Sequence, residues 1–495
     1  MLKAKLDELY EIIKIEKAYH YAISIIHWDM ETEMPKNGVE NASNVIEFLM
    51  SEMLEKTINE KVHSLLVYLE TNEDKLNFID KATVKEMKKN YDKMSKVPRD
   101  IISKYESTKI NAQQKWLEAK EKADFKIFLP SLKEIISFNK KIIEYRGFEE
   151  HPYNTLLNDY EINMNVEKLD IYFSYLEENL LPFIRKILKN KENKENPLDK
   201  LEISIEKQKL FSNFISRYIN FDYEKGVLKE SVHPFTLNLS NRDVRITTNY
   251  QINNVLSSIF STLHECGHGL YEQNINSELE RTPLNSGISM GIHESQSRLF
   301  ENIFGRSYSF WKGVYPRLQE IIPEFENICI EEFYKGINQV KASFIRVEAD
   351  ELTYSLHIML RYEIEKMIFN DEIDLNDLEK IWNEKTKEYF GLEINNPNDG
   401  ILQDIHWSSG LFGYFPSYAL GNAYASQIET SMREKMDLEF LLLSGNFKNI
   451  NNYLKDNIHI HGKLYSPDEL IKKISGEELN PKYYVEYLKN KYSNI

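Results

Sequence analysis

Ser261-Thr-Leu-His-Glu-Cys-Gly-His-Gly269 is the most informative stretch of the chain, because it places His264 and His268 four residues apart with Glu265 between them. On a helix, residues i and i+4 lie on the same face, so both imidazoles can bind one metal ion. The carboxylate beside the first histidine then points toward the open side of that ion, where it can act as a base. This spacing is typical of zinc peptidases. The alternative is a solvated or core-packed histidine pair, and a third ligand must decide between them.

A third ligand is predicted in residues 289–302, whose apolar spacing indicates a second helix after a loop that contains glycine. Two histidines and one glutamate leave the fourth position of a catalytic zinc ion to water. Glu294 is the predicted ligand, and His293 beside it is its rival. Glu294, Gln296 and Arg298 follow His293 within five residues, which indicates a hydrogen-bonded polar interior rather than a solvated helix face.

Hydrophobic periodicity predicts a mainly α-helical fold. Apolar residues recur at spacings of three and four at Leu6, Leu9, Ile12 and Ile13, and again at Leu352, Leu356, Met359, Leu360 and Ile364. Residues 227–250 are the exception, because alternating residues on both sides of an Asn-Arg-Asp turn predict a β-hairpin. The metal-binding helices are expected within residues 252–302. The hairpin precedes them, so its edge is expected to hydrogen-bond an extended peptide.

The chain is predicted to form one catalytic domain over residues 1–495. Its length alone would suggest about three domains, but the sequence contains no Gly/Ser-rich or Pro-rich spacer, no low-complexity tract and no internal repeat. A single large domain divided into two lobes is therefore the simpler prediction. The most polar stretch, residues 190–200, is expected to be an exposed loop between helices.

The net charge and the cysteine content indicate which binding partners and which cellular compartment the protein has. With 62 basic and 78 acidic side chains, the net charge is −16, which argues against nucleic acid and anionic membranes as partners. No run of 18 apolar residues exists, and the N-terminal segment lacks the apolar run of a secretion signal. Cys266 and Cys329 are the two cysteines, whereas a secreted chain of this size more often uses disulfides. We expect a cytoplasmic protein.

Four further blocks lie in order along the chain with the two histidine-containing segments. They are His233-Pro-Phe235, Asp243-Val-Arg-Ile-Thr247, Ile345-Arg-Val-Glu-Ala-Asp350 and Gly400-Ile-Leu-Gln-Asp-Ile-His-Trp407. Together, the six blocks resemble those of the carboxypeptidase Taq family of metallocarboxypeptidases, and residues 27–35 and 153–161 are also similar to that family. Cys266 departs from the pattern, since the family more often has an aromatic or small residue there. It lies roughly 200° around the helix from His264, which predicts a buried side chain that faces away from the metal.

The resemblance implies a two-lobed fold with a deep substrate cleft, related to neurolysin-like and angiotensin-converting-enzyme-like peptidases. It also implies one Zn²⁺ per chain, with Co²⁺ as the alternative, peptide substrates and a homodimer. The implied activity is release of single C-terminal residues with broad specificity. Oligopeptidases and dipeptidyl carboxypeptidases share this fold and metal site, so either activity is an alternative. A non-catalytic peptide-binding protein is a more remote one, because it would have no use for Glu265 beside three metal ligands.

Residues 406–418 are expected to stabilise the reaction intermediate, while Glu265 acts first as base and then as acid. The negative oxygen that hydrolysis creates needs a hydrogen-bond donor beside the metal. Tyr414 is the first choice, since Phe-Gly-Tyr-Phe is similar to the tyrosine loop of the related folds. His406 is the second choice and Tyr418 the third. With 30 tyrosines in the chain, a packing role for Tyr414 is the alternative.

A carboxypeptidase must also bind a free C-terminal carboxylate, which the guanidinium fork matches with two donors at once. Arg346 is the favoured residue, and Arg245 on the hairpin is the alternative. A structural ion pair of Arg346 with Glu348 or Asp350 is the competing interpretation. The His233 block and Tyr418 are also expected to contact the substrate.

Overall fold

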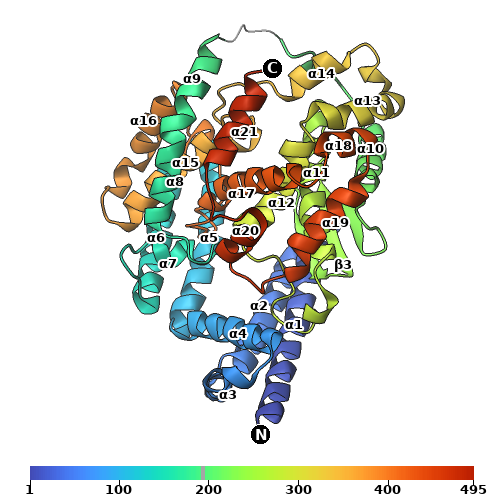
Figure 1. Ribbon diagram of the computed structural model, residues 1–495. Helices are drawn as coiled ribbons and strands as arrows, with labels where there is room; N and C mark the ends of the chain where they lie inside the picture. The colour runs from blue at the N-terminus through green and yellow to red at the C-terminus, as the bar shows by residue number, and fades with distance from the viewer. Residues whose placement is uncertain (191–194) are drawn as a thin grey trace.

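The computed structural model describes residues 1–190 and 195–495, and the prediction of a mainly helical fold is confirmed (Figure 1). The predicted loop at 190–200 lies partly outside the described residues, and Pro197–Lys200 form a short 3-10 helix. The first four helices are α1 (Leu2–Thr32), α2 (Val39–Thr57), α3 (Glu60–Thr71) and α4 (Phe78–Ser95). Helices α1, α3 and α4 enclose a small hydrophobic core of their own, which includes Leu9, Leu66 and Met87. In Figure 1 these blue helices project below the rest of the molecule.

The remaining helices surround a second, much larger hydrophobic core. They are α5 (Arg99–Lys122), α6 (Phe125–Arg146), α7 (Asn154–Leu157), α8 (Val166–Asn179), α9 (Leu181–Asn190), α10 (Ile205–Tyr218), α11 (Val255–Gln273), α12 (Met290–Arg298), α13 (Tyr308–Ile321), α14 (Ile330–Ile337), α15 (Tyr354–Phe369), α16 (Leu378–Phe390), α17 (Phe415–Arg433), α18 (Leu438–Ser444), α19 (Phe447–Asn457), α20 (Pro467–Ser475) and α21 (Lys482–Tyr492). Helix α17 crosses the middle of the molecule and packs along α12 (Figure 1).

The described residues contain one sheet of three strands, β1 (Gly226–Glu230), β2 (Thr236–Ser240) and β3 (Asp243–Thr248), in the order β1-β3-β2. Strands β2 and β3 pair antiparallel, as the hairpin prediction requires. The prediction missed β1, which pairs parallel to β3, because parallel pairing needs no tight turn and leaves no local turn signal. Strand β2 is an edge strand, and its Thr236 and Asn238 side chains contact α11.

None of the described helices is long and apolar enough to cross a membrane. Both cysteines are free. Cys266 is fully buried in the main core, as its position on the helix predicted, and Cys329 is exposed.

Candidate active site

Helices α11 and α12 pack very closely, and the sequence defines where each begins. The Asn254 side chain accepts from the backbone N–H of Ser257 to cap α11, and Ser289 accepts from that of Ile292 to cap α12. At Gly267 a Cβ atom would lie 2.5 Å from the Gln296 carbonyl oxygen. Only glycine therefore lets α11 approach α12 this closely.

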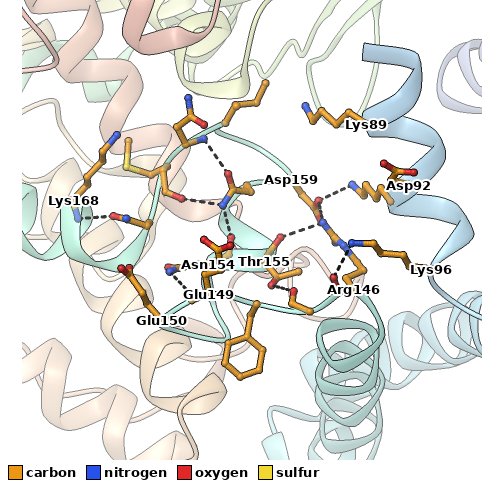
Figure 2. A pocket seen from close by; sticks show the side chains of 18 residues that line it. Lys89, Asp92, Lys96, Arg146, Glu149, Glu150, Asn154, Thr155, Asp159 and Lys168 are labelled. Carbon is orange, nitrogen blue, oxygen red and sulfur yellow. Dashed lines mark hydrogen bonds and ion pairs between the residues drawn. The ribbon is translucent and has the colours of Figure 1, made fainter. Parts of the chain in front are cut away.

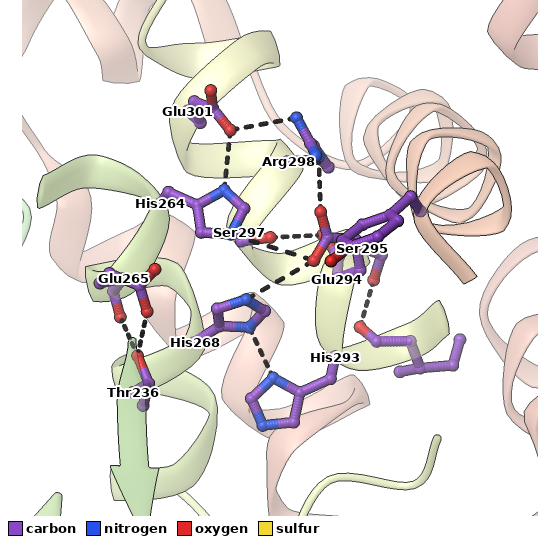
Figure 3. Close-up of polar contacts among 12 residues, drawn as sticks. Thr236, His264, Glu265, His268, His293, Glu294, Ser295, Ser297, Arg298 and Glu301 are labelled. Atoms are coloured by element: carbon purple, nitrogen blue, oxygen red, sulfur yellow. Dashed lines mark hydrogen bonds and ion pairs between the residues drawn. The ribbon is translucent and has the colours of Figure 1, made fainter. Parts of the chain in front are cut away.

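The three predicted metal ligands lie together at this contact (Figure 3). One ligand atom each of His264, His268 and Glu294 lies within 4.8 Å of the other two. Glu294 Oε2 is 3.9 Å from His264 Nε2 and 3.6 Å from His268 Nε2. Ligand atoms bound tetrahedrally to one zinc ion, with bonds of about 2.0–2.1 Å, are about 3.3 Å apart. The donor set and its spacing thus fit a metal ion of this kind.

His293, the rival ligand, lies outside this group. Its Nδ1 is 2.6 Å from Nδ1 of His268, and its Nε2 is 2.7 Å from Glu272 Oε1. Both ring nitrogens are therefore engaged with neighbouring side chains, and the imidazole supports His268 instead of joining the ligand set.

Two charged residues beside the ligands were not singled out as site residues from the sequence. Glu301 Oε2 is 2.7 Å from His264 Nδ1, and Arg298 donates to Glu294 Oε1 at 2.7 Å and to Glu301 Oε2 at 3.3 Å. Burial opposes the charge of Glu301, but Arg298 and His264 lower the pKa of its carboxyl to about 2. Glu301 follows Glu294 by seven residues, a helical spacing that could have revealed it.

Glu301 belongs to a short π-helix, Leu299–Phe304, that continues α12. Such π-helical turns are rare and frequently occur at functional sites. Within this turn, the carboxylate of Glu301 lies against the imidazole of His264.

Glu265, the predicted base, is buried on α11. The Thr236 hydroxyl on β2 donates to Glu265 Oε2 at 2.6 Å, so the sheet edge and α11 meet at this carboxylate. Burial raises the pKa of Glu265, which brings a carboxylate closer to the proton affinity that general-base catalysis near neutral pH requires.

The three candidates for an oxyanion donor form one aromatic cluster. The ring centroid of Tyr414 lies 5.6 Å from the ring centroid of His406 and 5.2 Å from that of Tyr418. Burial and then the charge of Glu294 raise the pKa of Tyr414, so the phenol stays protonated and can donate. His406 Nε2 is 3.2 Å from the Tyr418 hydroxyl. Burial lowers the pKa of His406 to about 3, which leaves the ring neutral.

Arg346 is buried and does form an ion pair, but with neither Glu348 nor Asp350. Its Nε and Nη2 donate to Asp404 Oδ1 at 3.1 and 2.9 Å. An ion pair is therefore present, but its partner Asp404 lies 58 residues away in the sequence.

Asp404 also accepts from Arg361 Nε through its second oxygen, at 2.7 Å. Two buried guanidinium groups thus share a single carboxylate, and the neighbouring His406 is neutral. One positive charge in this cluster remains uncompensated by Asp404, and a carboxylate is the ligand that would balance it.

Arg245 and His233 stand in different surroundings. Arg245 forms a two-pronged ion pair with Asp243, both contacts at 2.9 Å, and its guanidinium lies 5.5 Å from the centre of the Trp28 ring. It pairs with Leu237 in the sheet register, so it lies on the face opposite Thr236 and away from α11. His233 is exposed.

Glu365, a further residue that sequence reasoning missed, holds the loop that leads to Tyr414. This buried carboxylate on α15 accepts hydrogen bonds from the Tyr153 hydroxyl, from Trp407 Nε1 at 2.7 Å and from the backbone N–H of Gly413 at 2.8 Å. Two residues of this loop, Trp407 and Gly413, are therefore fixed to one side chain.

A separate cavity of about 960 Å³ opens between α4 and the segment that joins α6 to α8 (Figure 2). None of the predicted site residues lines it. On its wall, Arg146 donates to both oxygens of Asp159, at 2.8 and 2.7 Å, and Lys93 pairs with the same carboxylate at 2.8 Å. Two basic side chains therefore share one carboxylate in this cavity.

Comparison with known proteins agrees with the site. Residues 8–492 match the family model described as Carboxypeptidase Taq (M32) metallopeptidase. Carboxypeptidase 1 of Bacillus subtilis (strain 168) is 41% identical over 490 residues, which cover 99% of this chain and 98% of that protein. Thermostable carboxypeptidase 1 of Pyrococcus furiosus is 36% identical, with 96% of each chain covered. The solved structure titled Pyrococcus furiosus Carboxypeptidase Apo-Mg gives a TM-score of 0.96 at 35% identity, with 99% of each chain covered. The chain therefore belongs to the carboxypeptidase Taq (M32) family of metallopeptidases and is a metallocarboxypeptidase.

Proposed function

We propose that the enzyme releases single C-terminal residues from peptides with broad specificity, using one Zn²⁺, or alternatively Co²⁺, held by His264, His268 and Glu294. The observation that carries this proposal is the convergence of these three ligand atoms within 4.8 Å beside the buried Glu265. Bound there, the metal supplies Lewis acidity toward the scissile carbonyl and toward water. Glu265 takes a proton from the attacking water and delivers it to the departing amine.

Tyr414 is the proposed donor to the oxygen that becomes negative during attack. Its protonated phenol lies near the charge of Glu294 and within the cluster formed with His406 and Tyr418. A donor placed where charge develops lowers the barrier to the chemical step without tightening substrate binding. His406 and Tyr418 remain the second and third candidates, because each offers a polar atom in the same cluster.

Arg346 is the proposed anchor for the substrate carboxylate. The two guanidinium groups that share Asp404 leave one positive charge for a ligand, whereas the charge of Arg245 is matched by Asp243. The edge strand β2 would hold the extended peptide by strand addition. Its Thr236 already contacts Glu265, so a peptide along this edge would pass the base. His233 precedes this strand and would contact a residue farther from the cleavage point.

The wider organisation is also proposed. We infer that residues 1–495 act as one catalytic domain with two lobes around a deep cleft, of the neurolysin-like and angiotensin-converting-enzyme-like kind, and that two chains form a homodimer. The separate small core of α1, α3 and α4 supports a division into parts. Two free cysteines support a cytoplasmic location.

A peptide ladder with free and amidated C-termini tests the proposed specificity. Free peptides should lose one residue at a time, and amidation should lower kcat/KM roughly 10²- to 10³-fold, because it removes the charge that Arg346 pairs with. Arg346→Met should abolish this discrimination. Arg245→Met is the control and should preserve it; the reverse result would make Arg245 the anchor. Equal cleavage of both ladders by the wild type would instead favour an oligopeptidase.

A further inference from the structure

Glu272, His293 and His268 form a chain of contacts in that order. Figure 3 shows the imidazoles of His293 and His268. His293 lies between the other two residues. Its Nδ1 is 2.6 Å from His268 Nδ1, and its Nε2 is 2.7 Å from Glu272 Oε1. Glu272 is buried on α11, one turn after His268. It also accepts from the backbone N–H of Gly287 at 3.0 Å and from the side-chain amide of Asn238.

The contacts determine which ring nitrogens of His268 and His293 carry a proton. If His268 binds a metal through Nε2, its remaining proton is on Nδ1, so this nitrogen donates to His293. His293 Nδ1 must then accept, because a hydrogen bond between two nitrogens holds a single proton. A neutral His293 consequently carries its proton on Nε2 and donates it to Glu272. A doubly protonated His293 would set two N–H groups against each other.

We propose that Glu272 is a positioning residue for the metal centre, which fixes the tautomer of His293 and through it the orientation of His268. This inference rests on the proposed role of His268 as a ligand. Glu301 acts on the other histidine directly, because its carboxylate contacts His264 Nδ1 at 2.7 Å. One ligand thus has a carboxylate as its immediate partner, and the other has a carboxylate acting through an imidazole. Such outer contacts set the ring orientation and basicity of metal-binding histidines.

A simpler role for Glu272 is purely structural, since it also ties the loop at Gly287 to Asn238 on β2. A double-mutant cycle on metal affinity, measured by competition with a chelator, separates the two roles. Glu272→Met removes the acceptor and should weaken metal binding about 10- to 100-fold. In a His293→Phe background the same substitution should have no further effect, because no tautomer is left to fix.

Two further variants serve as controls for the double-mutant cycle. Asn238→Ala cuts the link to the strand but leaves the contact with His293, so it should keep metal affinity close to wild type. Glu272→Gln still offers an amide oxygen to His293 and should bind metal more tightly than Glu272→Met. Equal weakening by Glu272→Met in both backgrounds, or a loss in Asn238→Ala as large as in Glu272→Met, would overturn the proposal.

Nitrogen-15 NMR of histidine-labelled, metal-loaded wild type gives a test that needs no variant. His293 should be protonated on Nε2, and protonation on Nδ1 would overturn the proposal even if Glu272→Met does not fold. The His268→Ala variant distinguishes the two levels of inference. If it retains metal, the metal site and this inference fail together. If it loses metal while the cycle is additive, only the role of Glu272 fails.

Discussion

The hydroxyl of Tyr354 accepts a hydrogen bond from Arg346 Nη1 at 3.0 Å. The ring of the same tyrosine lies under the guanidinium of Arg298, 4.5 Å from its centre. Arg298 in turn binds the carboxylate of Glu294. One side chain therefore contacts both the arginine beside the proposed metal ligands and the arginine proposed to bind the substrate carboxylate.

Tyr354→Phe should weaken substrate recognition while leaving the metal in place. Arg346 loses one fixed acceptor, so we expect kcat/KM for peptides with a free C-terminus to fall about 10-fold, the scale of one hydrogen bond to a charged group. Metal content should not change, because Arg298 keeps its contacts with Glu294 and Glu301. Tyr315→Phe is the matched control, since its buried hydroxyl binds the Ile328 carbonyl at 2.8 Å. Equal kinetics in both variants would contradict the role of Tyr354.

The ligands and the base should separate cleanly by mutation. His264→Ala, His268→Ala and Glu294→Ala should each lose bound metal, whereas Glu265→Gln should keep it and lose turnover by roughly 10²- to 10⁴-fold. Elemental analysis of the four variants and their turnover rates provide the measurement. Full activity in Glu265→Gln would refute the assignment of the base.

Tyr414→Phe should lower kcat by roughly 10²-fold with little change in KM, because the hydroxyl is proposed to bind charge that develops only in the transition state. Steady-state kinetics on one peptide are sufficient. Tyr418→Phe and His406→Ala are the comparisons, since both residues lie in the same cluster. A normal kcat in Tyr414→Phe would make this tyrosine a packing residue and transfer the role to whichever comparison loses kcat.

Gly421→Ala should disturb the metal site from a neighbouring helix. A Cβ atom at this position of α17 would lie 2.5 Å from Cγ and 2.6 Å from Cβ of Glu294. The ligand carboxylate must shift, so chelator competition should show weaker metal binding. Gly391→Ala is the control, because its Cβ would meet nothing within 4 Å although its positive φ of 68° costs about 1 kcal/mol of strain. Unchanged metal affinity in Gly421→Ala would show that α17 moves away to accommodate the methyl group without displacing Glu294.

The proximity of His264 and His268 could be predicted because a helix fixes the relation between residues i and i+4, whatever surrounds it. Glu294 was predicted from the apolar spacing and the clustered polar residues of the segment 289–302. The contacts of the missed residues leave little local signal, and the seven-residue spacing from Glu294 to Glu301 is the exception. Glu301 reaches His264 through a π-helical turn, and Asp404 meets Arg346 across 58 residues of chain. Strand β1 was missed for the same reason, because its parallel partner β3 follows after the whole of β2.

The buried carboxyl of Glu365 holds the loop before Tyr414 through Trp407 and Gly413. Burial raises the pKa of Glu365 from 4.5 to about 7, although three donated hydrogen bonds oppose this shift. A carboxyl whose pKa is raised by folding binds more protons in the folded state between these two values. Its contribution to the free energy of unfolding is therefore fully present below about pH 4.5 and is lost as the pH rises through about 7.

Glu365→Gln carries no such proton equilibrium, so the stability of the wild type relative to this variant should fall between about pH 5 and about pH 8. Thermal unfolding of both proteins across this range measures the difference. The exposed Glu55→Gln removes the same charge from the surface and should show a nearly constant difference from wild type. If the Glu365→Gln difference is equally constant, the buried carboxyl does not change protonation on folding. In that case Glu365 holds Trp407 and Gly413 as a permanent carboxylate, and the loop keeps its anchor at every pH in the range.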